Sequence, residues 1–282
     1  MTRVAFFTDS ASDLDPVFAA THGIGIVPLL VYFGRESFKA GVDLSSEAFW
    51  ERMVAPDAPF PTTAASSPGE FKDAYEAAFA AGADSIVSIH VAGTLSGTIK
   101  SAQIARDLLP EREIHVIDSG GASMAEGILA LMGVELALAG RSAAEIAEVL
   151  EARSRDMVMY VALESLDYLR KGGRISGAQA AIGTLLSVKP IIRVQHGLIE
   201  QGDRVRTRAK ARERLIEMIC ERPVERLAIL YTIGADAAPF RDEVLARLPN
   251  LHRDDVEIAL VGPSVGPHLG PACVGAVAMY AA

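Results

Sequence analysis

The chain has 282 residues, of which 50% are hydrophobic and 6% aromatic, and its formal net charge is -9 at pH 7. These values predict a globular protein with a sizeable core and two domains. They argue against general nucleic-acid binding, because the field of an acidic chain repels the phosphate backbone. The two cysteines form no C-x-x-C pair and the first residues contain no long apolar region, so we expect a cytoplasmic protein. The apolar run over residues 127–134 is too short to span a bilayer, and we expect no stable membrane insertion.

Strand-like and helix-like segments alternate through the first half of the chain, a pattern that predicts a parallel sheet. The expected strands lie at 4–7, 25–32, 85–91 and 114–117, and the expected helices near 71–81, 97–108 and 122–139. A capping box at Ser142 begins a further helix that ends near Arg153. This helix is expected to close a first domain of residues 1–153.

The second half predicts a domain of residues 154–282 with a different kind of sheet. It begins with the apolar strand MVMYVAL, followed by two helices, the second of which runs through AQAAIGTLL at 178–186. The short strands around KPIIRV and GLIEQG are joined by a tight turn, which indicates antiparallel pairing. A helix from Ala209 and two more strand and helix units follow. The predicted fold is therefore α/β, with a parallel, Rossmann-like sheet domain followed by a mixed or antiparallel α/β domain.

Three strands of the first domain end in turns rich in hydroxyl and carboxylate side chains: TDSASD, AGTLSGT and DSGGAS. The carboxyl edge of a parallel sheet is where ligands bind, and helix starts offer anions free N–H groups and a favourable dipole. A fourth cluster, TTAASSPGE, leads into a helix capped by Ser67. Helix capping alone also explains each single cluster, because Ser, Thr and Asp are the preferred caps. No turn has the spacing of a nucleotide-binding loop, and the scattered His and Cys residues predict no metal site.

A literal G-x-S-x-G runs from Gly262 to Gly266, which raises the question whether Ser264 is a hydrolase nucleophile. A strand precedes the motif, but the nearby prolines prevent a regular helix from following it. No Asp or Glu follows Ser264, and His268 is too close in sequence for the usual late catalytic histidine. We therefore predict that Ser264 is no nucleophile, and His268 needs another role.

Eight segments together resemble the DegV family, the fatty-acid-binding subunits of bacterial fatty acid kinase. They are TDSASDL, TTAASSPGEF, LSGTIKSA, VIDS, YLRKGGRI, LLSVKPII, RVRTRAKA and GPHLGP. The resemblance covers nearly the whole chain. It implies two α/β domains with a long-chain fatty acid between them as ligand, and no cofactor. It also implies a non-catalytic subunit, a monomer on its own, that presents the fatty acid carboxylate to a separate ATP-using kinase subunit for acyl-phosphate formation.

The resemblance implies a carboxylate site assembled from separate turns. The matching positions are Thr63, Ser96, His268 and Arg174. A second layer behind them is expected to include Thr62, Gly97, Asp9 and Ser10. The chain departs from the common family pattern after Thr63, where the family often has T-S-Q-P-S, and at Ala272, where it often has glycine.

A fatty acid needs two opposite environments. Burial of about 14 methylenes at about 0.8 kcal/mol each contributes about 11 kcal/mol gross, which offsets the cost of association. A carboxylate removed from water needs several donors, and the hydroxyls of Thr63 and Ser96 with an N–H of His268 would supply them. A histidine that merely caps a Gly/Pro turn remains the alternative for His268.

The basic segment RVRTRAKARER, residues 204–214, contains Arg206 at the family position linked to the kinase subunit. We expect Arg206 to be exposed near the mouth of the pocket. Two other interpretations stay open: a stand-alone enzyme that uses Asp9 or Asp118 on an acyl or phosphoryl substrate, and a nucleic-acid module built on the basic segment. The segment has no interleaved aromatic residues, which favours a solvated face or a protein-docking surface over nucleic-acid binding.

Overall fold

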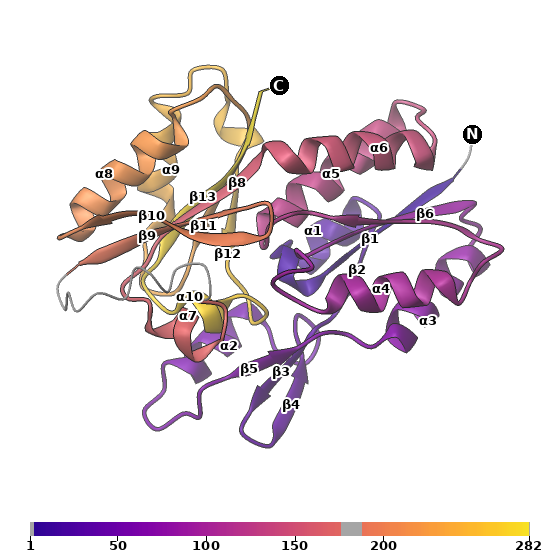
Figure 1. The fold of residues 1–282 in the computed structure, drawn as a ribbon, viewed down its shortest axis with the longest axis horizontal. Helices are drawn as coiled ribbons and strands as arrows, with labels where there is room; N and C mark the ends of the chain where they lie inside the picture. The colour runs from indigo at the N-terminus through magenta and orange to yellow at the C-terminus, as the bar shows by residue number, and fades with distance from the viewer. Residues whose placement is uncertain (1–2, 176–187, 282) are drawn as a thin grey trace.

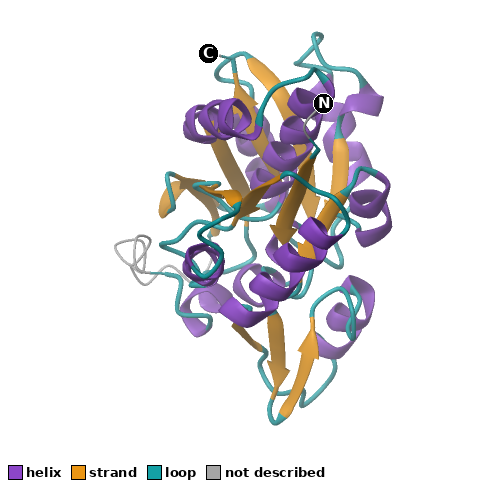
Figure 2. Ribbon diagram, turned by 90° about the vertical axis from the view of Figure 1, so that its right-hand side faces the viewer, coloured by secondary structure: helices purple, strands orange, loops and turns teal. Residues whose placement is uncertain are grey.

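The computed structural model describes residues 3–175 and 188–281, so the helix predicted over 178–186 lies outside the described residues. The protein is a mixed α/β structure with a parallel four-stranded sheet and a separate six-stranded mixed sheet (Figure 1). A third sheet of three short strands extends at one end of the molecule (Figure 2). Within the described ranges, no helix has the length and apolar character needed to cross a membrane.

The parallel sheet forms the centre of the first half of the chain and confirms the predicted sheet type. Its strands, in spatial order, are β2 (Ile24–Val27), β1 (Val4–Asp9), β6 (Ser85–His90) and β7 (Glu113–Asp118). Every residue of β6 is buried, as expected for a central strand covered on both faces. The covering helices are α3 (Pro68–Ala80) and α4 (Thr98–Asp107) on one face, and α5 (Met124–Leu138) and α6 (Ala143–Arg153) on the other.

The single strand predicted over 25–32 is wrong, because Pro28 divides this stretch between two sheets. Proline cannot donate to a ladder, so it marks the point where pairing changes. β3 (Leu30–Phe33) starts the small antiparallel sheet, in which β4 (Glu36–Lys39) and β5 (Thr62–Ala64) flank it. The hydroxyl cluster that leads into the helix capped by Ser67 therefore begins with a short strand of this small sheet, which includes Thr63.

The small sheet has its own apolar cluster and is tied to the second half of the chain. Phe33 of β3 packs with Phe49 and Trp50 of α2 (Ser46–Met53). The fully buried Trp50 donates its indole N–H to the Val261 carbonyl oxygen at 2.7 Å.

The six-stranded sheet occupies the second half of the chain. Its strands, in spatial order, are β10 (Leu198–Val205), β9 (Lys189–Gln195), β8 (Met157–Ala162), β13 (Val274–Tyr280), β11 (Val224–Tyr231) and β12 (Glu257–Leu260). Neighbours are antiparallel except β11 and β12, and the antiparallel β9 and β10 pair confirms the pairing that the sequence predicts. α8 (Arg208–Ile219) and α9 (Ala237–Leu245) pack on one face.

Helix α5 joins the two large sheets, because it contacts β1 and β6 of the first and β8, β11 and β13 of the second. The chain changes sheet between β7 and β8, an interval that contains the predicted boundary near residue 153; a division at that residue stays a prediction. The remaining elements are short: η1 (Ser10–Ser12), α1 (Pro16–Thr21), η2 (Ser154–Asp156), α7 (Asp167–Lys171), η4 (Arg253–Asp255) and α10 (Gly266–Leu269).

Candidate functional site

A partly open cavity brings together the four residues that the family resemblance assigns to carboxylate binding. Its polar lining consists of Thr63, Ser96, Arg174, Ser264 and His268. The rest of the lining is apolar and comes from both halves of the chain: Ala11, Leu29, Val91, Leu95, Ala122, Met159, Leu169, Ile192, Val194, Ile199, Val265 and Leu269. The fold therefore places one group of polar side chains in an otherwise apolar cavity.

The cavity is narrow. Its volume is about 60 Å³, whereas pockets for drug-sized ligands measure about 300 Å³ or more. A carboxylate group has room among the polar side chains, but a long chain requires the apolar walls to separate.

Ser96 and Arg174 are held in place by short-range contacts around the start of α4. The Ser96 hydroxyl lies 2.8 Å from Thr98 Oγ1 and accepts the Thr98 amide at 3.3 Å. Arg174 donates from Nε to the Leu95 carbonyl oxygen at 3.2 Å and from Nη1 to the Gly172 carbonyl oxygen at 2.8 Å. Backbone carbonyls orient the guanidinium, whose charge no carboxylate within the described residues neutralises.

His268 is half-buried, and its buried Nδ1 atom has no hydrogen-bond partner within the described part of the chain. Burial, and secondly the charge of Arg174, lowers the pKa of His268 to about 4. The imidazole is therefore neutral at pH 7, with one nitrogen that donates and one that accepts. The backbone of Gly172 packs directly on the ring, so that a methyl group at this position would overlap Nδ1.

The segment that carries His268 is fixed by the first half of the chain. The Asp13 carboxylate accepts the Gly262 amide at 2.8 Å, and Ser10 Oγ lies 2.9 Å from Ser264 Oγ. Only the four-residue α10 follows the G-x-S-x-G motif, and the Ser264 hydroxyl pairs with another serine rather than with a histidine. The prediction against a nucleophile elbow agrees with this geometry.

The expected second layer is only partly near the cavity. Ser10 contacts the lining residue Ser264, and Gly97 is the N-cap of α4 directly after Ser96. Asp9 accepts the amides of Ala11 and Val91, both of which line the cavity. Thr62 is exposed, because alternation along β5 directs it away from the side on which Thr63 meets the cavity.

Asp9 also belongs to a buried network with the geometry of a catalytic triad. Ser88 Oγ lies 2.7 Å from His90 Nε2, and His90 Nδ1 lies 2.9 Å from Asp9 Oδ2. The Tyr75 hydroxyl donates to Ser88 at 2.8 Å, and the side chains of all four residues are fully buried. A nucleophile needs access to substrate, so this network is structural. The S-x-x-S-x-H pattern of β6 carries the only sequence signal for it, two polar residues on one face of an apolar strand.

Asp118, the other carboxylate considered for catalysis, also has a structural role. Its two oxygens accept the amides of Gly93 and Gly120, at 3.1 and 2.8 Å, and so join two turns at the carboxyl edge of the parallel sheet. In the described residues, no three His, Cys, Asp or Glu side chains are grouped in a way that could hold a metal ion.

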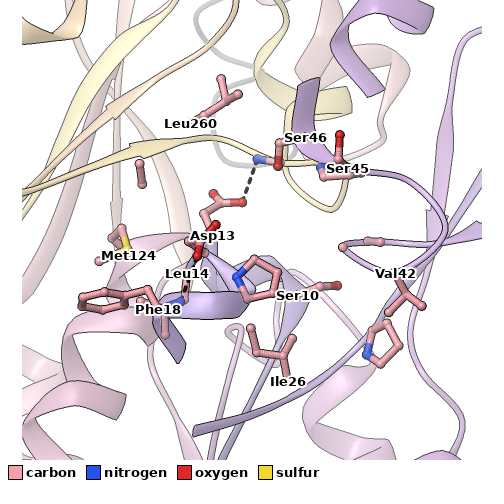
Figure 3. Close-up of a pocket in the computed structure, with 18 of the residues that line it drawn as sticks. Ser10, Asp13, Leu14, Phe18, Ile26, Val42, Ser45, Ser46, Met124 and Leu260 are labelled. Carbon is pink, nitrogen blue, oxygen red and sulfur yellow. Dashed lines mark hydrogen bonds between the residues drawn. The ribbon is translucent and has the colours of Figure 1, made fainter. Parts of the chain in front are cut away.

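A second hollow, a cleft of about 800 Å³, lies beside Asp13 (Figure 3). Burial raises the pKa of Asp13 to about 7, although hydrogen bonds from Ser123 and Gly262 act in the opposite direction. The pKa of Glu126 lies well above its usual range, because the side chain is buried and faces Asp9 and Asp13. Three carboxyl groups, those of Asp9, Asp13 and Glu126, thus lie close together behind the segment that carries His268.

The basic segment is less cationic than its sequence predicts. Arg208, Arg212 and Arg214 pair with Glu164, Glu243 and Asp203. Arg206 is exposed, as expected. Ile199, which lines the cavity, is near the beginning of β10, whereas Arg206 follows the last residue of this strand. Along an extended strand the two residues are about 23 Å apart. The expectation that Arg206 lies at the pocket mouth is therefore not supported.

Comparison with known proteins agrees with this fold. A family model described as "Uncharacterised protein, DegV family" matches residues 3–281. The chain belongs to the DegV family. A DegV domain-containing protein of Deinococcus radiodurans is 36% identical over 276 residues, which cover 96% of each chain.

Two solved structures, the first of them named as a DegV family protein, are similar over nearly their whole length. One, from Thermus thermophilus, is named for its fatty acid binding; it shares 32% identity and a TM-score of 0.89 over 99% of this chain and 100% of that one. The other, from Eubacterium ventriosum, is named as a stearic acid-binding protein; it shares 27% identity and a TM-score of 0.88 over 99% of this chain and 98% of that one.

The contact between Gly172 and His268 predicts a sharp steric effect. Gly172→Ala should displace the His268 imidazole and reduce the affinity for a carboxylate ligand in the cavity by about tenfold or more. The reason is that the ligand carboxylate would lose one of its hydrogen-bond donors. Gly69→Ala, in the first turn of α3 where a methyl group has space, is the matched control. Calorimetric titration of both variants with the same ligand measures the effect, and equal affinities would contradict the packing of His268 described above.

The raised pKa of Asp13 predicts a pH-dependent stability. The ordinary pKa is 3.8 and the folded one about 7, so between these values the folded protein holds a proton that the unfolded chain has lost. The free energy of unfolding contributed by Asp13 therefore falls as pH rises from about 4 to about 7. Asp13→Asn abolishes this titration and keeps an acceptor for Gly262, so its stability relative to wild type should rise across that window. Urea unfolding at several pH values tests this, with Asp73→Asn on the exposed side of α3 as control; parallel curves for wild type and Asp13→Asn would refute it.

Proposed function

We propose that this protein binds a long-chain fatty acid in the cavity, with the carboxylate at the polar group and the tail along the apolar walls. The observation that carries the proposal is the convergence of Thr63, Ser96, Arg174 and His268 in a cavity whose other walls, apart from Ser264, are apolar. The names of the related structures from Thermus thermophilus and Eubacterium ventriosum, which describe fatty acid binding, support it.

The polar group suits a carboxylate better than a neutral head group. The Arg174 guanidinium supplies positive charge, and hydrogen bonds to a charged group are shorter and stronger than neutral ones. Thr63 and Ser96 add hydroxyl donors, and the neutral imidazole of His268 adds one N–H. Together they would replace the water that a buried carboxylate loses.

The same arrangement supports a role in presentation rather than catalysis. Ser96 and Arg174 also line an outer hollow of about 440 Å³, formed by residues 93–97, 173, 174 and 197–199. A carboxylate bound by these two residues is therefore next to a surface that a second protein can reach. We propose that a separate ATP-dependent kinase subunit, in the cytoplasm, phosphorylates the bound fatty acid there to an acyl phosphate.

Extraction of the purified protein tests the ligand directly. Mass spectrometry of an organic extract should show a long-chain fatty acid in near-stoichiometric amount, since a buried tail dissociates slowly. Ser96→Ala and His268→Ala should each weaken binding by about 1 to 3 kcal/mol, the cost of a missing donor to a buried carboxylate. Ser37→Ala and His252→Ala, at exposed positions, are matched controls. Absence of any acyl chain, even after loading with oleate and palmitate, would remove the proposal.

The kinase step is tested separately at Arg206. This residue is exposed at one end of β10, and a protein interface of about 800 Å² per partner is wide enough to include both Arg206 and the outer hollow. Arg206→Ala should leave fatty acid affinity unchanged but lower acyl-phosphate formation when a kinase subunit and ATP are supplied. Arg35→Ala, at another exposed position, is the control. Turnover equal to wild type would discard the docking role.

A further inference from the structure

The large cleft of Figure 3 is separate from the fatty acid cavity and shares no lining residue with it. It lies between the turn after β1, the helix α1, the edge strand β2, the start of α2 and the edge strand β12. At about 800 Å³ it is much the larger of the two. Nothing in the fatty acid site requires it.

The cleft is lined by acidic side chains and by no basic ones. The acidic side chains are Asp13, Asp15, Glu47 and Glu257, and the lining includes no Lys, Arg or His. None of the four makes an ion pair within residues 3–175 and 188–281, where seventeen other carboxylates do. Helix starts account for Asp15 and Glu47. They do not account for Glu257, which lies in a strand, and the combined field favours a cationic occupant.

The other walls of the cleft are largely apolar. Phe18, Ile26, Met124 and Leu260 contribute side chains from four different elements (Figure 3). Val42 lies on the lining with 69% of its surface exposed. An occupant that covered these residues would bury apolar surface in addition to meeting the carboxylates.

The backbone of β12 adds a third kind of group. In the described sheet, β12 is hydrogen-bonded to β11 only. Val261 donates its amide to the Tyr231 carbonyl oxygen at 2.9 Å, so the alternation of strand hydrogen bonds turns the amide groups of Ile258 and Leu260 to the other side. Both residues line the cleft, which therefore offers an open strand edge.

We propose that this cleft docks an extended segment of a partner protein that carries Lys or Arg side chains, added as a strand to the edge of β12. Main-chain hydrogen bonds would hold the segment, and the carboxylates and apolar walls would select alternate basic and apolar side chains. A small amine would satisfy the carboxylates but leave the strand edge unused, which is why a peptide is the better match.

A defined peptide tests the proposal on the whole protein. The probe is an acetylated and amidated peptide of alternating Lys and Val, about six residues long, the usual length of a strand. Calorimetry at low ionic strength should show that it binds, whereas the same peptide with Glu in place of Lys does not. The combined variant Asp15→Asn, Glu47→Gln and Glu257→Gln should weaken binding by about tenfold or more, since each lost charge pair contributes a fraction of a kcal/mol and the pairs act together.

The control variant is Asp73→Asn, Glu148→Gln and Asp254→Asn, three exposed carboxylates outside the cleft, with the same change in net charge. It should retain peptide binding, and both variants should retain fatty acid binding, so failure here is distinct from failure of the fatty acid proposal. Hydrogen exchange should show that the peptide protects the amides of Ile258 and Leu260. Absence of binding, equal weakening by the two variants, or binding without protection of these amides would each overturn the proposal.

Discussion

The hydrogen bond between the Asp13 carboxylate and the Gly262 amide connects the two halves of the protein at the point on which its binding site depends. Asp13 has a left-handed backbone conformation, with φ 55°, at the end of the turn after β1, and Gly262 begins the segment that carries Ser264 and His268. A side chain at position 262 would meet Asp13 and Ser46, so the close approach needs glycine. Carboxylate, amide and glycine together determine where His268 lies relative to Thr63 and Ser96, which belong to the first half of the chain.

This connection has an electrostatic cost. Asp9 and Glu126 are fully buried, and loss of hydration raises the pKa of both Asp13 and Glu126. Apolar residues of similar volume would avoid that cost but could not accept the amides of Gly262, Ala11 and Val91. Buried polar groups that reduce stability while fixing a geometry are common at functional sites. We therefore explain the cluster of Asp9, Asp13 and Glu126 by its role in positioning residues 262–268, and not by a contribution to the stability of the core.

The sequence predicted what depends on local pattern and missed what depends on distant contacts. The alternation of apolar strands and capped helices was sufficient for the parallel sheet and for the helices begun by Ser67 and Ser142. It failed at residues 25–32, where one apolar run serves two sheets and only Pro28 marks the change. The polar site residues could be named from a family resemblance, but not their burial. Likewise, the acidic partners of the basic segment, such as Glu164 for Arg208, are too distant in sequence for a local pattern to reveal.

The small volume of the cavity and the contacts that hold residues 262–268 both limit how a long ligand could fit into the site. A tail of about 14 methylenes gains about 11 kcal/mol gross on burial, yet the described walls enclose about 60 Å³. Under the proposed function, binding would therefore have to separate apolar side chains that now pack on one another, and part of the gain from the tail would compensate for those lost contacts. The segment at 262–268 is held by its contacts to Ser10 and Asp13, and Arg174 is held by the carbonyl oxygens of Leu95 and Gly172. In the proposed complex the polar end, held by Asp13 and by the backbone contacts of Arg174, would thus be the fixed part of the site, and the apolar walls would be the part that adapts to the length of the fatty acid.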